Sequence, residues 1–245
     1  MSTALQREWA PYCGAAPLPD ALLARWNLDP LLLAGIGLAT LALWYWSRRP
    51  AATAGFALLA VILFVSPFCA LSSALFSARV THHVALTAVM APLIAFAVPL
   101  ERWSWRGSLS LWTGVQALTF WVWHAPPVYE AAMSSYLVYW TMQLSLLGTA
   151  FGFWVAVRRS SAPSAIAALL FSTVQMGLLG ALITFAGVPL FAPHYVSTQP
   201  WGYSPLEDQQ LAGLIMWAPS AALYLAAALL VASRWLTREE RELAA

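Results

Sequence analysis

Long stretches without a charged side chain constrain this sequence more than any motif in it. Seven such stretches, none with Asp, Glu or Arg well inside it, lie near 30–47, 52–71, 80–100, 107–124, 136–157, 165–187 and 210–233. A helix needs roughly 20 mostly apolar residues to cross a bilayer core. Only 9% of all residues are charged, whereas a soluble domain carries roughly a quarter. The sequence therefore predicts an all-α, polytopic membrane protein with seven transmembrane helices.

Arginines predict the orientation of these helices. All 12 basic residues are arginine, and nine of them lie at alternate ends of the predicted helices: Arg48, Arg49, Arg102, Arg106, Arg158, Arg159, Arg234, Arg238 and Arg241. The opposite ends carry only Arg7, Arg25 and Arg79. Because cytoplasmic loops are enriched in basic residues, we expect the N-terminus outside and the C-terminus in the cytoplasm.

The same boundaries divide the chain into three parts. Residues 1–29 are expected to form an extracytoplasmic segment, 30–235 the transmembrane domain and 236–245 a cytoplasmic tail. The first part has charged residues but no apolar core, so it does not resemble a cleavable signal peptide.

The composition excludes several functions of membrane proteins. A retinal Schiff base needs a lysine, and the chain has none. Proton pumps and ion-coupled transporters usually place acids or bases within the membrane, whereas here charged residues lie at the span ends. The GxSxG and HExxH motifs of hydrolases are absent. A net charge of +2 is too small to indicate nucleic-acid binding. We therefore expect neither an enzyme nor a nucleic-acid-binding protein.

All four histidines are expected on the outer side of the membrane. His82 and His83 begin the third predicted span, His124 closes the fourth, and His194 lies in the loop before the seventh. A histidine at a membrane interface is more often structural than a ligand. That reading is favoured for His124 or His194 taken singly, and for the His82–His83 pair the two readings stay balanced, since adjacent helical residues point in different directions.

Soft or acidic ligands are expected on the same side. Cys69 lies near the end of the second span, Asp208 begins the seventh, and Met216 follows Asp208 at two spacings of four. Imidazole with sulfur suits Cu(I) or Zn better than Mg or Ca. Two of these residues also have a structural alternative. Cys69 could be a small buried side chain, and Asp208 could cap its helix. With Cys13 as the other cysteine, no disulfide framework is expected.

Three segments resemble the CtaG family of cytochrome c oxidase assembly factors. They are SPFCALSSALFSARVTHHVALTAVMAPLIA at 66–95, WHAPPVYEAAMSSYLVYWTMQLSLLGTAFGFW at 123–154 and PLEDQQLAGLIMWAPSA at 205–221. The resemblance implies a multi-pass protein of the bacterial inner membrane that assists copper delivery to a haem-copper oxidase on the periplasmic face. It implies oxidase subunits, a periplasmic copper chaperone and the lipid bilayer as partners.

The resemblance also implies which residues hold copper. The matching positions are His83, His124, Asp208 and Met216, to which His82 and Cys69 are added as candidate ligands of Cu(I). The chain departs from the family pattern at four positions. Arg79 stands where the family usually has a histidine and His82 where it has a glutamine, while Tyr139 and Gln143 replace two histidines four residues apart.

Two alternative functions stay open. The protein could be a scaffold or accessory subunit that docks laterally on the oxidase and never binds metal, as the replaced family histidines suggest. It could also be a carrier of a small molecule or a protein that handles haem.

Overall fold

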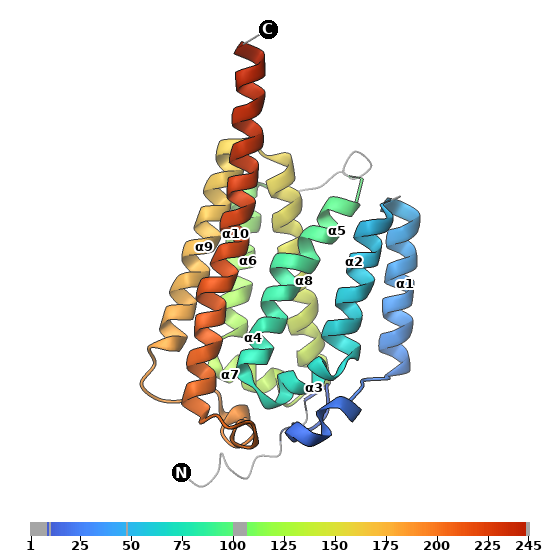
Figure 1. Ribbon diagram of the computed structural model, residues 1–245, viewed down its shortest axis with the longest axis vertical. Helices are drawn as coiled ribbons and strands as arrows, with labels where there is room; N and C mark the ends of the chain where they lie inside the picture. The colour runs from blue at the N-terminus through green and yellow to red at the C-terminus, as the bar shows by residue number, and fades with distance from the viewer. Residues whose placement is uncertain (1–8, 10, 48, 100–106, 244–245) are drawn as a thin grey trace.

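The computed structural model describes residues 9, 11–47, 49–99 and 107–243, which form helices and connecting turns without a strand among them (Figure 1). The α-helices are α1 (Pro30–Ser47), α2 (Pro50–Ala60), α3 (Pro67–Ala74), α4 (Phe76–Ala85), α5 (Ala91–Ala97), α6 (Leu109–Trp123), α7 (Pro126–Ala132), α8 (Tyr136–Arg159), α9 (Ala162–Thr184) and α10 (Pro205–Leu243). Two π-helical segments continue α2 and α4, namely η2 (Val61–Val65) and η3 (Leu86–Met90). Short 3₁₀ helices are η1 (Pro19–Ala24), η5 (Ala192–His194) and η6 (Gln199–Trp201).

Several helices are suited to cross a membrane, as expected. Five segments of the described chain are long and apolar enough: Pro30–Ser47, Phe76–Ala97, Tyr136–Arg159, Ala162–Thr184 and Pro205–Glu242. A sixth arises if Pro50–Val65 and Pro67–Ala74, which meet at a bend of 48°, count as one span. The bend follows from Ser66, whose extended backbone ends η2 and whose hydroxyl accepts the N–H of Phe68 at 3.2 Å. Helix α6, at 15 residues, is shorter than its predicted span.

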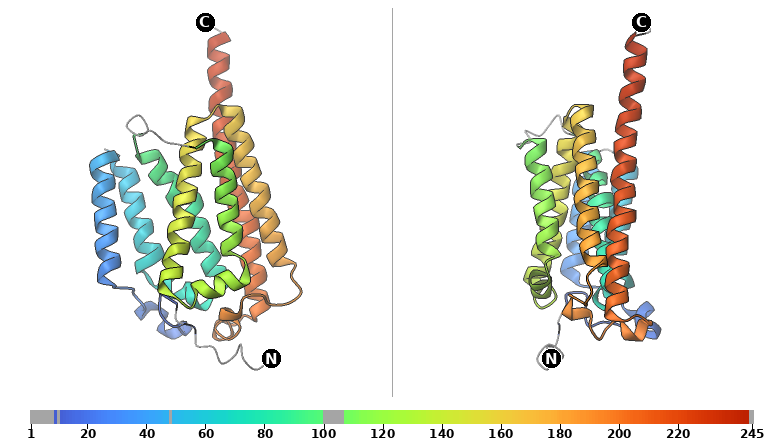
Figure 2. Two further views of the ribbon diagram at one scale, coloured as in Figure 1. Left: turned by 180° about the vertical axis from the view of Figure 1, so that it is seen from behind. Right: turned by 90° about the vertical axis from the view of Figure 1, so that its left-hand side faces the viewer.

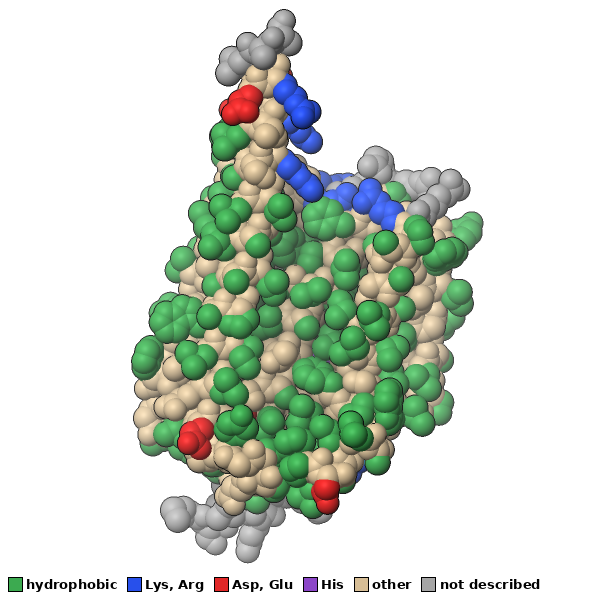
Figure 3. All heavy atoms as spheres, viewed as in Figure 1, with side chains coloured by type: hydrophobic (Ala, Val, Ile, Leu, Met, Phe, Trp, Pro, Cys, Tyr) green, Lys and Arg blue, Asp and Glu red, His purple; other side chains and the backbone are tan. Residues whose placement is uncertain are grey.

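The bundle has two chemically different ends. We call the end formed by η1, α3, α7 and residues 185–204 the histidine end, and the end with Arg49, Arg158, Arg159, Arg234, Arg238 and Arg241 the arginine end (Figures 1 and 2). In Figure 3 basic side chains gather at the arginine end, and apolar side chains cover the bundle below it. Helix η1 lies at the histidine end, whereas the C-terminal part of α10 extends from the arginine end (Figure 1). Arg7, Arg48, Arg102 and Arg106 lie outside the described residues.

Helices α9 and α10 approach each other closely where each helix carries a glycine. A Cβ added to Gly213 would lie 2.6 Å from the carbonyl oxygen of Gly180 and would also overlap the Thr184 hydroxyl. A Cβ on Gly180 would lie 2.7 Å from the carbonyl oxygen of Gly213. Small residues at such crossings let backbones of membrane helices pack closely. Close contact between the two backbones therefore holds α10 against α9, with no large side chain between the helices at this crossing.

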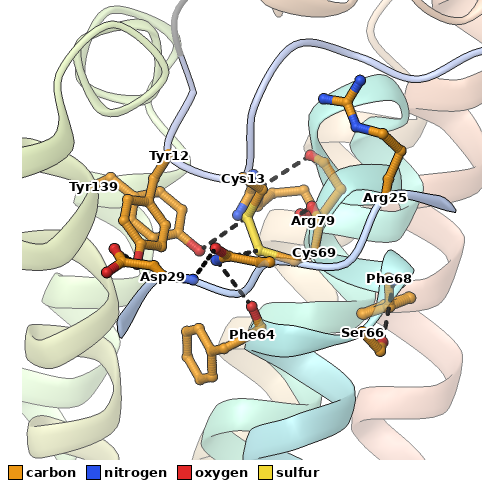
Figure 4. Close-up of a disulfide and its surroundings, with 12 residues drawn as sticks. Tyr12, Cys13, Arg25, Asp29, Phe64, Ser66, Phe68, Cys69, Arg79 and Tyr139 are labelled. Carbon is orange, nitrogen blue, oxygen red and sulfur yellow. Dashed lines mark hydrogen bonds between the residues drawn. A yellow bond between two sulfur atoms is a disulfide. The ribbon is translucent and has the colours of Figure 1, made fainter. Parts of the chain in front are cut away.

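One disulfide joins the N-terminal segment to α3. Cys13 and Cys69 are bonded although 56 residues apart, and the segment before α1 folds back under α3 to bring them together (Figure 4). Closing a loop of this length is worth about 4 kcal/mol in the chain-entropy treatment. From the sequence we expected no disulfide framework and considered Cys69 as a metal ligand or a small buried side chain. The sequence does not reveal this bond, because periodicity within one helix carries no information about a partner in the distant N-terminal segment.

We predict that Gly213→Ala lowers the free energy of unfolding by about 1–3 kcal/mol, because a single methyl group overpacks the α9–α10 crossing. Thermal unfolding of the purified protein in detergent measures the loss. The matched control is Gly148→Ala in α8, where nothing lies within 4 Å of the added Cβ. The control should be neutral or stabilising, since alanine favours helix over glycine. Equal unfolding midpoints for Gly213→Ala and the unchanged protein would contradict this account of the crossing.

Candidate metal site at the histidine end

The start of α4 is held by a carboxylate from α10. Leu75 precedes α4 with extended backbone and offers no side-chain cap. The Phe76 N–H instead donates to Oδ2 of Asp208 at 2.6 Å, and the Ser77 hydroxyl donates to Oδ1 at 2.5 Å. A carboxylate at a helix N-terminus satisfies otherwise unpaired N–H groups and is favoured by the helix dipole. Asp208 therefore decides where α4 begins.

Asp208 is free for this role because α10 caps itself. The Ser204 N–H donates to Oε2 of Glu207 at 2.8 Å, and the Glu207 N–H donates to the Ser204 hydroxyl at 3.2 Å. This reciprocal arrangement is a capping box. The cap predicted from the sequence for Asp208 thus belongs to a different helix. Both oxygens of this predicted metal ligand are engaged at α4.

His83 and His124 meet in the interior. His83 lies in the second turn of α4, and His124 lies directly after α6. Nδ1 of His83 lies 3.5 Å from Nε2 of His124. Their side chains are buried, with 0% and 3% of their surfaces exposed. Two ring nitrogens from different helices therefore face each other away from water.

The orientation of His124 is set by its own helix. Its Nδ1 lies 2.7 Å from the carbonyl oxygen of Phe120, and its ring stacks on the Phe120 ring with centroids 4.4 Å apart. An Nδ1–H donated to that carbonyl leaves a lone pair on Nε2, directed at His83. Hydrogen bonding of the second nitrogen is how proteins commonly orient a histidine ligand.

His82 points away from this pair. Its ring packs edge-on against Phe64 with centroids 4.9 Å apart, and its centroid lies 5.9 Å from that of His83. The side chain is fully buried, and neither ring nitrogen has a hydrogen-bond partner in the described structure. Because buried polar atoms are nearly always paired, two unpaired nitrogens at His82 are unusual.

A buried cation lies one turn before His83. Arg79 is fully buried; its Nε donates to the Ser72 carbonyl at 3.2 Å, and its guanidinium lies 5.3 Å from the centroid of the Tyr139 ring. No carboxylate of the described residues forms an ion pair with it. The sequence had suggested an interfacial arginine, because position alone does not reveal that α3 and α8 cover it. A positive charge here disfavours a second cation nearby.

Two sulfur atoms at the histidine end have partners of their own. Met216 is fully buried in α10. The sulfur of Met133 lies 3.9 Å from the Arg79 guanidinium, and the sulfur of Cys69 is bonded to Cys13. Among the described residues, no three or more His, Cys, Asp or Glu side chains are placed to share an ion.

His194 has a structural role. The Tyr129 hydroxyl lies 2.7 Å from its Nε2, and its Nδ1 lies 3.2 Å from the Ala74 carbonyl oxygen. These contacts fit a neutral ring with the proton on Nδ1. Burial lowers the pKa of His194 to about 3, partly opposed by the contact with Ala74. The neutral ring joins the loop before α10 to α7 and to the end of α3.

The chemistry available here is therefore that of a buried two-nitrogen site. At a metal–nitrogen distance of about 2.0 Å, nitrogens 3.5 Å apart subtend an angle of about 120°. Cu(I) accepts a small number of ligands in such surroundings, and these are soft sulfur atoms or imidazole nitrogens. The pair also forms a direct N–H···N hydrogen bond when no ion lies between the rings.

We predict that Asp208→Ala lowers the free energy of unfolding by about 1.5–3 kcal/mol, because it removes charge-assisted hydrogen bonds to the start of α4. Thermal unfolding measures the change, and Asp20→Ala, which alters an exposed acid at the same end, is the control. If Asp208→Ala unfolded at the same temperature as the control variant, capping of α4 by this carboxylate would be disproved.

Comparison with known proteins identifies a family over most of the chain. The model of a family described as cytochrome c oxidase caa3 assembly factor (Caa3_CtaG) matches residues 32–238. This range includes α2 to α9 and all four histidines. No curated protein and no solved structure gave a match.

Proposed function

The chain belongs to the family of cytochrome c oxidase caa3 assembly factors, and on that premise we propose that it carries Cu(I) as cargo for the oxidase between His83 and His124. The observation that carries the proposal is the 3.5 Å separation of Nδ1 and Nε2 across α4 and α6. The proposed role involves binding and transfer of an ion without turnover of a substrate.

A proton shift would make the pair available to an ion. When the rings bond directly, Nδ1 of His83 donates its hydrogen to Nε2 of His124. Nε2 of His83 has no partner in the described structure, so the proton can move there without breaking another hydrogen bond. Both facing nitrogens then present lone pairs, while the His124 ring stays in place through Phe120.

Two features support an outward-facing histidine end. Arginines are typical of cytoplasmic ends, and the described basic residues of the opposite end include Arg158, Arg159 and Arg234. Disulfides persist in oxidising compartments, and the Cys13–Cys69 bond lies at the histidine end. We therefore propose seven passes in the bacterial inner membrane, with the N-terminus in the periplasm, where a copper chaperone and oxidase subunits would be met.

We predict that the purified protein binds up to one equivalent of Cu(I) and that His83→Ala with His124→Ala abolishes this binding. A competition titration against a Cu(I) chelator measures it. His194→Gln is the matched control, because it removes a buried histidine at the same end that lies outside the pair. Unchanged Cu(I) affinity in the double variant would exclude the pair as the site.

A second function is favoured by Arg79. Its buried charge one turn from His83 opposes a cation in the site, and no third ligand of the His, Cys, Asp or Glu type joins the pair in the described structure. These observations support a scaffold that binds the oxidase laterally during assembly and carries no copper.

Complementation separates delivery from scaffolding. In a strain that lacks the gene, we expect the His83→Ala, His124→Ala variant to yield oxidase deficient in copper, as measured by metal analysis of the purified enzyme. The His194→Gln variant should restore a copper-replete enzyme. If the double variant also restored a copper-replete oxidase, the scaffold function would replace the delivery function.

A further inference from the structure

A cavity of about 540 Å³ lies between α1, α2, η3 and α8. Its walls include Ile36, Phe56, Phe64, Met90, Trp140 and Leu147. Helix α1 forms its outer wall and lies at the margin of the bundle (Figures 1 and 2), with mostly exposed side chains. The volume is within the range of small-molecule sites, and its apolar walls suit a ligand that arrives from the bilayer.

One polar side chain in this cavity has no hydrogen bond of ordinary geometry. Gln143 lines the cavity, 1% of its surface is exposed, and neither its amide oxygen nor its amide nitrogen forms a hydrogen bond in the described structure. An unpaired buried polar group costs about 1–3 kcal/mol. The Tyr139 hydroxyl, one turn earlier on α8, lies 3.6 Å from the Cys13 sulfur and also close to the Gln143 side chain, but it makes no hydrogen bond of ordinary geometry with that amide. The amide thus offers a donor and an acceptor to a ligand.

The histidine end of the cavity carries a negative charge. Tyr12 and Asp29 both line it, and the Tyr12 hydroxyl donates to Oδ2 of Asp29 at 2.7 Å. This bond, together with the Leu31 N–H, lowers the pKa of Asp29 and keeps the carboxylate ionised. A phosphate headgroup beside that carboxylate is disfavoured by like-charge repulsion. A ligand with a neutral head is therefore preferred over an anionic phospholipid.

Aromatic rings shape the space beside Gln143. Phe64 and Trp140 stack with centroids 5.7 Å apart and planes 18° from parallel, and both line the cavity. Such faces favour a planar head in offset-stacked or edge-on contact. A planar, neutral head with carbonyl or hydroxyl groups and an apolar tail has the chemistry of a quinone or quinol.

We propose that this cavity binds a lipid-soluble quinone or quinol whose carbonyl or hydroxyl head hydrogen-bonds the Gln143 amide and whose tail follows α1 and α8 into the bilayer. The carbonyl accepts from the amide nitrogen, and the hydroxyl of the reduced form donates to the amide oxygen. The site is separate from the His83–His124 pair and does not depend on copper binding.

Decylubiquinone tests the proposal. The purified protein in phosphatidylcholine nanodiscs is equilibrated with decylubiquinone, and the quinone retained per protein is measured after removal of the free compound. We expect saturable binding near one equivalent, weakened at least tenfold by Gln143→Leu. This variant should fold, since leucine removes an unpaired polar group from an apolar site.

Two further variants complete the experiment. Gln116→Leu is the matched control, because Gln116 is equally buried but donates to the Tyr224 hydroxyl at 2.9 Å, away from the cavity; it should bind decylubiquinone normally. Gly35→Leu should block binding by filling the cavity, since Gly35 lines it with nothing within 4 Å of an added Cβ. Non-saturable partitioning, a copurified phospholipid that decylubiquinone cannot displace, or equal affinity in Gln143→Leu and Gln116→Leu would overturn the proposal.

Discussion

The contact between the Asp208 carboxylate and the start of α4 is the interaction on which the histidine end depends. It joins two segments 132 residues apart and pairs the Phe76 N–H where the chain turns sharply from α3. Arg79 and His83 follow within two turns, so their directions depend on where α4 begins. The geometry of the histidine pair on α4 is thus controlled from α10, which is itself held in place by its glycine contact with α9.

Several buried polar atoms in the interior have no hydrogen bond. His82, His83 and Gln143 together contribute five such atoms in the described structure, and the Arg79 guanidinium contributes another. Their neighbours are apolar or aromatic, so the helices gain little from burying them. Native proteins rarely tolerate this except at sites where something else binds. The unpaired atoms of these residues lie in two places, because His83 faces His124 whereas Gln143 lines the cavity behind α1.

Much of the fold could be predicted from the sequence, because apolar length and proline position are local properties. Most helices begin and end close to the predicted ranges, whereas α10 runs from Pro205 to Leu243 and so extends beyond the predicted 210–233. The sequence placed His83 and His124 at the same end of the bundle but did not predict that their rings meet. The burial of Arg79 could not be predicted, since an arginine near the end of an apolar stretch usually reaches water. The partners of Asp208 and Cys69 lie 131–132 and 56 residues away, and spacing within a helix carries no information about such contacts.

The bond between Cys13 and Cys69 has a consequence for how the protein is made. Cys13 is synthesised first and stays unpaired until the segment with Cys69 has been inserted, so the bridge cannot close before that point in biogenesis. In the proposed topology this step takes place in the periplasm and needs an electron acceptor there. Maturation of an oxidase through this factor would then rely on the envelope's thiol-oxidising enzymes, and respiratory capacity would respond to the supply of oxidising equivalents outside the cell membrane.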